Sequence, residues 1–126
     1  MLIKMTISTY KLLLITLAEI ISENEFFDFE AKYLGKSKEI TPADLDERQT
    51  QEVKELAVKI FKSLKLKGLT RSEFIFHNNQ PHFLECNACP GLTEASLLPQ
   101  QAKAAGISLQ ELFSNAVEVA LQNFEG

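Results

Sequence analysis

Four polar residues in the second half of the chain have the types and the spacing of a metal site. Arg71 and Glu73 are two positions apart, and so are Glu85 and Asn87. Side chains two apart in a strand share one face, so a hairpin could set Glu73 opposite Glu85 and Arg71 opposite Asn87. Opposed glutamates repel each other at a Cβ separation of about 5 Å. Two carboxylates and an amide oxygen suit Mg²⁺, although a solvent-facing strand would show the same alternation.

The flanking sequence predicts the hairpin that this pairing needs. Residues 68–77 and 81–87 both alternate between polar and apolar side chains, as strands do. Residues 78–80, Asn-Asn-Gln, indicate a tight turn between them. A three-residue loop at this turn would place the two glutamates directly opposite each other.

An anion-binding element is predicted immediately after the second strand. The chain leaves that strand through Pro90-Gly91 and enters a helical stretch that ends near 105–106, with Thr93 or Ser96 as the capping residue. Backbone amides at the start of a helix bind small anions. Metal ligands, a guanidinium and an anion site within one short stretch suggest phosphate and carboxylate chemistry.

The ordered set of these segments resembles the C-terminal part of the D-alanine-D-alanine ligases, a family of the ATP-grasp superfamily. The resemblance covers most of the chain. A lone Glu-x-Asn is a weak signal, whereas the ordered set is a strong one. The segments that carry it are 26–33, 41–45, the Arg71/Glu73 strand, the Glu85/Asn87 strand, 90–93 and 96–99.

The resemblance implies a metal site and an oxyanion site. Glu85 and Asn87 fall on the magnesium ligands of the family, and Glu73 falls where the family usually has aspartate. The longer glutamate side chain is expected to keep the ligand role with a shifted metal position. Arg71 and the backbone amide of Gly91 match the pair that stabilises the oxyanion.

The substrate-binding residues are also implied by the resemblance. Ser96 and Leu97 match the positions that hold the carboxylate of the second D-alanine, through a hydroxyl and a backbone amide. Lys32 matches a lysine that reaches the γ-phosphate of ATP. Tyr33 matches a mobile-loop tyrosine that closes the site and accompanies an amino acid as second substrate. The implied cofactors are ATP and two Mg²⁺ or Mn²⁺ ions.

The implied function is ATP-dependent ligation of two D-alanines through an acyl phosphate, for peptidoglycan precursor synthesis in the cytoplasm. One alternative is another ATP-grasp carboxylate-amine ligase with a different second substrate, which the loop of Lys32 and Tyr33 and the pair Ser96-Leu97 disfavour. The other is a domain without catalytic activity that binds a partner or associates with itself.

The length suggests that the chain is only part of such a ligase. Residues 1–126 are expected to form one domain, without the N-terminal and most of the central part of the family. Lys4 stands where the family is expected to have a ribose-binding glutamate. The isolated chain is therefore expected to be inactive, and apolar surface left uncovered would favour a homo-oligomer.

The predicted fold class is α+β: an antiparallel sheet of about four strands covered by helices. A long helix is expected after Asp44, with 41–44 as its capping start, and two helices are expected after Gly91. Ser108 is expected to cap the last helix. The apolar run 10–21 is expected to be one buried strand, since it contains a glutamate and is too short to span a membrane.

Two classes of partner are disfavoured by composition. A net charge of −4 and a pI near 5.2 disfavour nucleic acid, which favours a basic surface. The two cysteines form a single Cys86-x-x-Cys89 pattern, whereas a structural zinc site needs four ligands. They are expected to be thiols of a reducing compartment.

Overall fold

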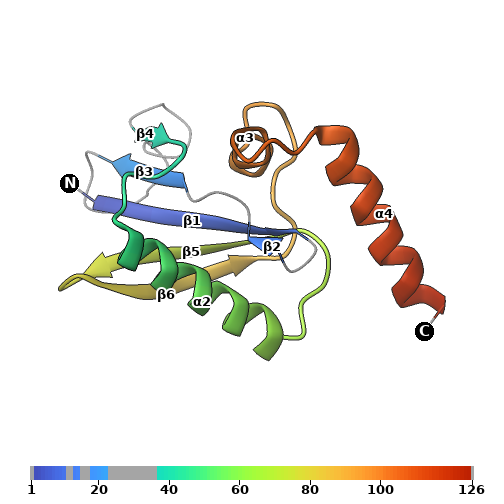
Figure 1. Ribbon diagram of the computed structural model, residues 1–126, viewed down its shortest axis with the longest axis horizontal. Helices are drawn as coiled ribbons and strands as arrows, with labels where there is room; N and C mark the ends of the chain where they lie inside the picture. The colour runs from blue at the N-terminus through green and yellow to red at the C-terminus, as the bar shows by residue number, and fades with distance from the viewer. Residues whose placement is uncertain (1, 11–12, 15–17, 23–36, 126) are drawn as a thin grey trace.

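The computed structural model describes residues 2–10, 13–14, 18–22 and 37–125, and its centre is one antiparallel sheet (Figure 1). The strands are β1 (Leu2–Tyr10), β2 (Leu13–Leu14), β3 (Ala18–Ser22), β4 (Ser37–Ile40), β5 (Thr70–His77) and β6 (Gln80–Asn87). The sheet order is β4-β3-β1-β5-β6, and β2 pairs with β1 at one end. The predicted α+β class is confirmed, with six strands among the described residues rather than about four.

The apolar run near the N-terminus does not form the single strand that was predicted. Within residues 10–21 the chain ends β1, pairs back on it through β2, and then forms most of β3. Tyr10 of β1 pairs with Leu13 of β2, and the two strands are antiparallel. The run contains no glycine or proline, and hydropathy alone therefore gave no sign of this reversal.

The β5–β6 hairpin has the predicted register but a different turn and a β-bulge. Its turn has two residues rather than three, and both Asn78 and Asn79 have positive φ angles of 50° and 63°. Such angles are typical of the tight turns that join twisted strands. A β-bulge next to Phe74 then shifts the pairing by one residue, so that Glu73 still lies opposite Glu85.

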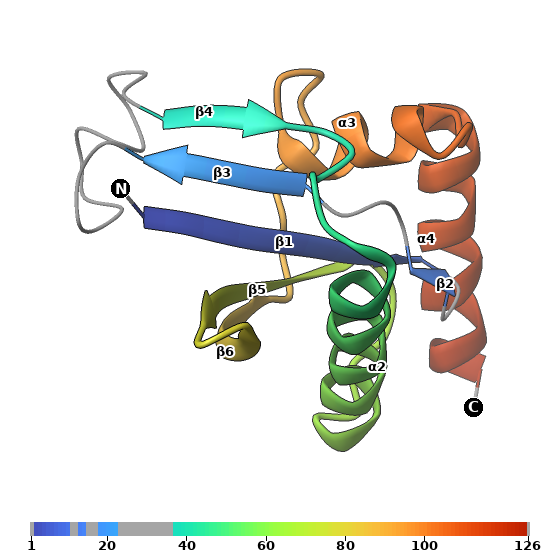
Figure 2. The same cartoon turned by 60° about the vertical axis from the view of Figure 1, so that its left-hand side comes forward.

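Helix α2 (Glu47–Ser63) covers one face of the sheet and forms the main core. Ile7 and Phe74, from neighbouring strands, are fully buried against Val53 and Ala57 of α2. Figure 2 shows α2 on one side of the sheet and helix α3 (Leu97–Ala104) on the other. The buried polar side chains of Lys4, Ser8 and Glu73 lie on the face opposite α2.

The start of α2 lies later than the predicted 41–44 segment. Asp46 is the N-cap residue: its carboxylate accepts a 2.7 Å hydrogen bond from the Gln49 amide, and the Gln49 side chain bonds back to the Asp46 amide. This reciprocal pair is a capping box. Thr41 and Asp44 precede the helix because the cap formed with Gln49 satisfies the free amides of its first turn.

A second core joins α3 to helix α4 (Leu109–Glu125). Leu98, Ala102 and Leu112 are fully buried together. Ser108 caps α4 as predicted, because its hydroxyl accepts a 3.1 Å hydrogen bond from the Glu111 amide. The buried side chain of Gln101 accepts a hydrogen bond from Ser8, which ties α3 to β1.

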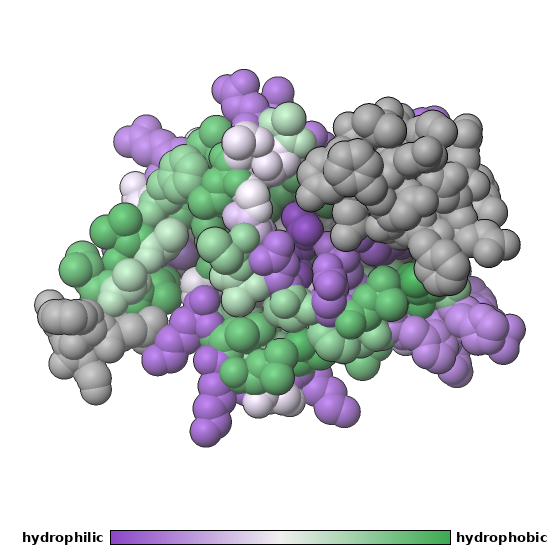
Figure 3. Space-filling model, turned by 180° about the vertical axis from the view of Figure 1, so that it is seen from behind, coloured by the Kyte–Doolittle hydropathy of each residue, from purple (hydrophilic) through white to green (hydrophobic). Residues whose placement is uncertain are grey.

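The outer surface of α4 is apolar. Phe113, Val117 and Leu121 follow one another at helical spacing and are 42%, 59% and 57% exposed. In Figure 3, hydrophobic side chains reach the surface at the end of the molecule that α4 occupies. Separately, none of the helices in the described ranges is both long and apolar enough to cross a membrane.

Candidate active site

The predicted site residues gather on the sheet face opposite α2. Because β1, β5 and β6 are adjacent, Thr6 pairs with Glu73, and Glu73 pairs in turn with Glu85. One step along, Arg71 pairs with Asn87. Paired residues share a face of the sheet. The predicted opposition of the two glutamates, and of arginine with asparagine, is confirmed.

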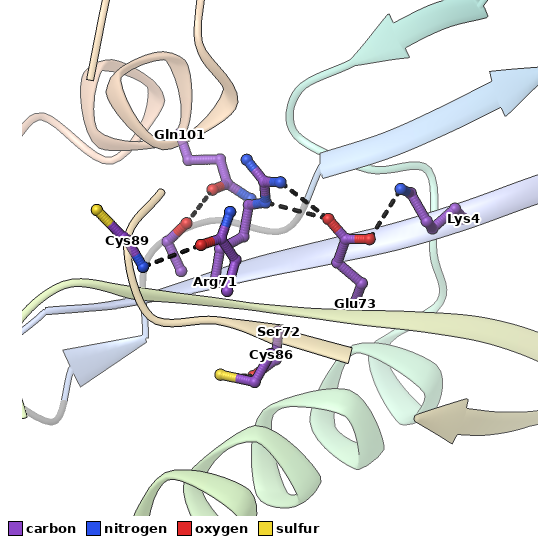
Figure 4. Close-up of polar contacts among 9 residues, drawn as sticks. Lys4, Arg71, Ser72, Glu73, Cys86, Cys89 and Gln101 are labelled. Atoms are coloured by element: carbon purple, nitrogen blue, oxygen red, sulfur yellow. Dashed lines mark hydrogen bonds and ion pairs between the residues drawn. The ribbon is translucent and has the colours of Figure 1, made fainter. Parts of the chain in front are cut away.

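Glu73 lies at the centre of a buried ionic network (Figure 4). Its Oε2 accepts a 2.8 Å hydrogen bond from Nζ of Lys4, and its Oε1 accepts hydrogen bonds of 2.9 and 3.3 Å from Nη2 and Nε of Arg71. Burial raises the pKa of Glu73, but Lys4 and then Arg71 outweigh it, so the pKa lies below its usual value. Glu73 is therefore ionised at neutral pH.

Glu85 and Asn87 present oxygen atoms at the edge of this network. Glu85 is exposed, and Asn87 is half-buried with its Oδ1 accepting a 2.9 Å hydrogen bond from the Cys89 amide. That bond fixes the orientation of the amide and leaves the oxygen one further lone pair. A carboxylate and an amide oxygen fit a hard divalent cation. Both oxygens of Glu73, by contrast, already accept hydrogen bonds from protein cations.

The loop after β6 brings Gly91 against Ser96. Ser96 occupies the N-cap position of α3, but its hydroxyl bonds at 2.7 Å to the Thr93 hydroxyl and not to the helix backbone. Leu97 is the first residue of α3, so its amide belongs to the first turn. Such amides have no partner within the helix and can bind an anion. The structure thus places the predicted Gly91 against Ser96, and Leu97 follows as the first residue of α3.

Replacing Gly91 with alanine should disturb Ser96. A Cβ atom on Gly91 would lie 2.9 Å from the Ser96 hydroxyl oxygen, closer than van der Waals contact allows. We expect the free energy of unfolding in urea to fall by about 1 kcal/mol, at the low end of the cost of overpacking. The double variant Gly91→Ala/Ser96→Ala removes the clashing hydroxyl. It should recover most of this loss, and failure to recover would contradict the proposed contact.

The remaining sequence candidates are placed as follows. Lys32 and Tyr33 lie outside the described residues. The Cys86 thiol accepts a 3.7 Å hydrogen bond from Ser72 on the α2 side of the sheet, whereas the Cys89 side chain lies on the opposite side (Figure 4). The two thiols therefore do not face a common point.

Sequence analysis did not identify Lys4 as a partner of Glu73. The signal was present, because Lys4, Thr6 and Ser8 alternate with the apolar Met5 and Ile7. Such alternation indicates a strand with one polar face. It does not say which strand will lie next to it, and that neighbour is β5.

The chain belongs to the D-alanine-D-alanine ligase family, because a model of the family "D-ala D-ala ligase C-terminus" matches residues 3–118. The D-alanine-D-alanine ligase of Christiangramia forsetii is 58% identical over 111 residues, which are 88% of this chain and 34% of that protein. The ligase of Leptospira interrogans is 49% identical over 114 residues, 90% of this chain and 32% of the relative. The chain thus spans about a third of the length of the curated relatives it matches.

Solved structures share the fold. The D-alanine-D-alanine ligase of Bacillus anthracis, solved in complex with ATP, matches with a TM-score of 0.82 and 26% identity, over 100% of this chain and 41% of that one. The VanG D-Ala:D-Ser ligase of Enterococcus faecalis matches with a TM-score of 0.78 and 26% identity, over 92% of this chain and 35% of that one. The fold is therefore that of the ATP-grasp ligases.

Proposed function

We propose that this chain supplies the metal-binding and second-substrate part of an ATP-dependent D-alanine-D-alanine ligase. The observation that carries the proposal is the pairing of Arg71 and Glu73 with Asn87 and Glu85, beside the turn that holds Gly91. A 58%-identical relative is named D-alanine-D-alanine ligase, and a solved structure of the same fold is an ATP complex. The ligation would proceed through an acyl phosphate and serve peptidoglycan precursor synthesis in the cytoplasm.

In this proposal Glu85 and Asn87 hold a Mg²⁺ or Mn²⁺ ion. When bound, such an ion neutralises negative charge during phosphoryl transfer. Lys32 reaches the γ-phosphate of ATP, and Tyr33 closes the site. Closure matters because an acyl phosphate hydrolyses unless water is excluded.

The residues around α3 act on the second substrate and on the developing oxyanion. The Ser96 hydroxyl and the Leu97 amide bind the carboxylate of the second D-alanine, as expected of free amides at a helix start. Arg71 and the Gly91 amide donate hydrogen bonds to the carbonyl oxygen as the amine adds to the acyl phosphate. Donors aimed at developing charge stabilise the transition state.

We further propose that residues 1–126 act as one domain and do not complete the reaction alone. The chain spans 34% of the length of its relative from Christiangramia forsetii. The adenine pocket and the pocket for the first D-alanine are proposed to lie in the parts of the family that this chain does not span. The alternative within the same superfamily is a ligase that takes another amino acid as second substrate, since one structural match is named a D-Ala:D-Ser ligase.

Isothermal titration calorimetry, with Mg²⁺-ATP titrated into the pure chain, tests the proposed half-site. Replacing Glu85 with glutamine keeps the size of the side chain and removes its charge. We expect the dissociation constant to rise by roughly tenfold or more, because ligand charge sets affinity for hard divalent ions. Glu94→Gln, in the loop before α3, is the matched control and should bind like the unmodified chain.

Two results would contradict the proposed half-site. Equal affinity of the unmodified chain and Glu85→Gln would show that Glu85 does not hold the ion. Ligase activity of the pure chain with D-alanine and ATP would show that the chain is complete by itself, contrary to the proposed division.

A second candidate function, self-association through α4, is favoured by the exposed side chains of Phe113, Val117 and Leu121. An apolar stripe of this kind is a common protein contact surface. We expect sedimentation velocity to show an oligomer that forms as concentration rises and that Val117→Glu dissociates. A monomer at all concentrations would rule this candidate out without affecting the proposed ligase role.

A further inference from the structure

The carboxylate of Glu73 is fully engaged by two protein cations. Lys4 bonds to one oxygen at 2.8 Å and Arg71 bonds to the other at 2.9 Å. Glu73 is 2% exposed and Lys4 is 8% exposed, so little water screens their interaction. The backbone of Lys4 is held in place, because β1 is a central strand with β3 and β5 hydrogen-bonded on its two sides.

This arrangement already offsets the electrostatic repulsion between Glu73 and Glu85. The positive charges of Lys4 and Arg71 balance the negative charges of the two glutamates, so the four side chains together are neutral. A divalent ion bound to Glu73 would lie within about 4 Å of the Lys4 ammonium, at which distance like charges repel strongly in a poorly solvated site. Binding there would require Lys4 to give up its ion pair.

We propose that Lys4 is an internal cation that excludes metal from Glu73, so that a divalent ion at this site is held by Glu85 and Asn87 without Glu73. The inference rests on the proposed function, in which Glu85 and Asn87 hold the ion. It adds a specificity-determining residue, since Lys4 sets how many carboxylates the ion contacts and therefore how tightly it binds. Glu73 then acts as a positioning residue that holds Arg71 in place.

Titration with Mn²⁺, monitored by electron paramagnetic resonance, tests this role without measuring activity. The full chain is compared with Lys4→Met, with Lys4→Met/Glu73→Gln and with the control Lys38→Met, whose lysine is exposed on β4. The double variant has the same net charge as the unmodified chain and no carboxylate at position 73. Near-UV circular dichroism establishes that each variant is folded at the temperature of the titration.

We expect Lys4→Met to bind Mn²⁺ about tenfold more tightly, because a second carboxylate becomes available. The double variant and Lys38→Met should bind like the unmodified chain. Equal affinity of Lys4→Met and the unmodified chain would overturn the inference. So would a tenfold weaker double variant, because Glu73 would then already be a ligand.

The failure of this inference differs from the failure of the proposed half-site. If Glu85→Gln weakens Mn²⁺ binding but Lys4→Met leaves it unchanged, the inference alone is overturned. If Mn²⁺ binds to none of these proteins, both the inference and the proposed metal half-site are overturned.

Discussion

Replacing Glu73 with glutamine should lower the free energy of unfolding by about 3–5 kcal/mol, the usual cost of removing one partner from a buried ion pair. Glu73 is 2% exposed and forms ion pairs with both Lys4 and Arg71. Without its charge, Lys4 and Arg71 would lose the anion to which both are hydrogen-bonded. Urea denaturation followed by circular dichroism measures the loss.

Two further proteins make the Glu73 result specific to the ion pair. Glu94→Gln removes the same charge from an exposed loop, and its effect should stay within about 0.5 kcal/mol. Lys4→Met/Glu73→Gln removes the anion together with one cation, so it should be more stable than Glu73→Gln alone. A loss below about 1 kcal/mol for Glu73→Gln would contradict the buried network.

Replacing Phe74 with alanine should also cost about 3–5 kcal/mol, through the cavity that it leaves in the core. Phe74 is fully buried between the sheet and α2, and its ring meets that of Phe83 edge-on with centroids 5.8 Å apart. Val53 and Ala57 come from one rigid helix and can collapse into the space only in part. Thermal or urea unfolding of the variant measures the loss.

Phe113→Ala is the matched control for the core prediction. It removes the same ring from α4, where the side chain is 42% exposed. Less buried apolar surface is therefore lost than at Phe74. Its effect should be less than half that of Phe74→Ala, because little or no cavity forms. Equal losses for the two variants would contradict the assignment of Phe74 to the main core.

The parts of the structure that the sequence predicted are those with a local signal. The helical spacing from Val53 to Phe61 predicted α2, and Ser108 predicted the start of α4. The register of Glu73 and Glu85 was also predicted, although from a loop one residue too long. Two errors compensated there, because a shorter turn and an unforeseen bulge produce the same final pairing.

The parts that were missed depend on contacts between distant segments. The cap of α2 is a local exception, since Asp46 and Gln49, which form its capping box, are only three residues apart. The pairing of Lys4 with Glu73 joins residues far apart in the chain, and no local pattern specifies which strand lies beside which. Strict alternation along β6 also fails, since Phe83 and Glu85 lie on opposite faces although they are two residues apart.

The bulge in β6 links the length of the turn to the face of the sheet on which Glu85 lies. Phe83 pairs with Phe74 and Glu85 pairs with Glu73, which leaves Leu84 without a partner of its own. If Leu84 were drawn into regular pairing, Glu85 would rotate toward α2 and away from Arg71. In relatives, a turn longer by one residue should therefore occur together with a straight second strand, and the two changes should be inherited as a unit.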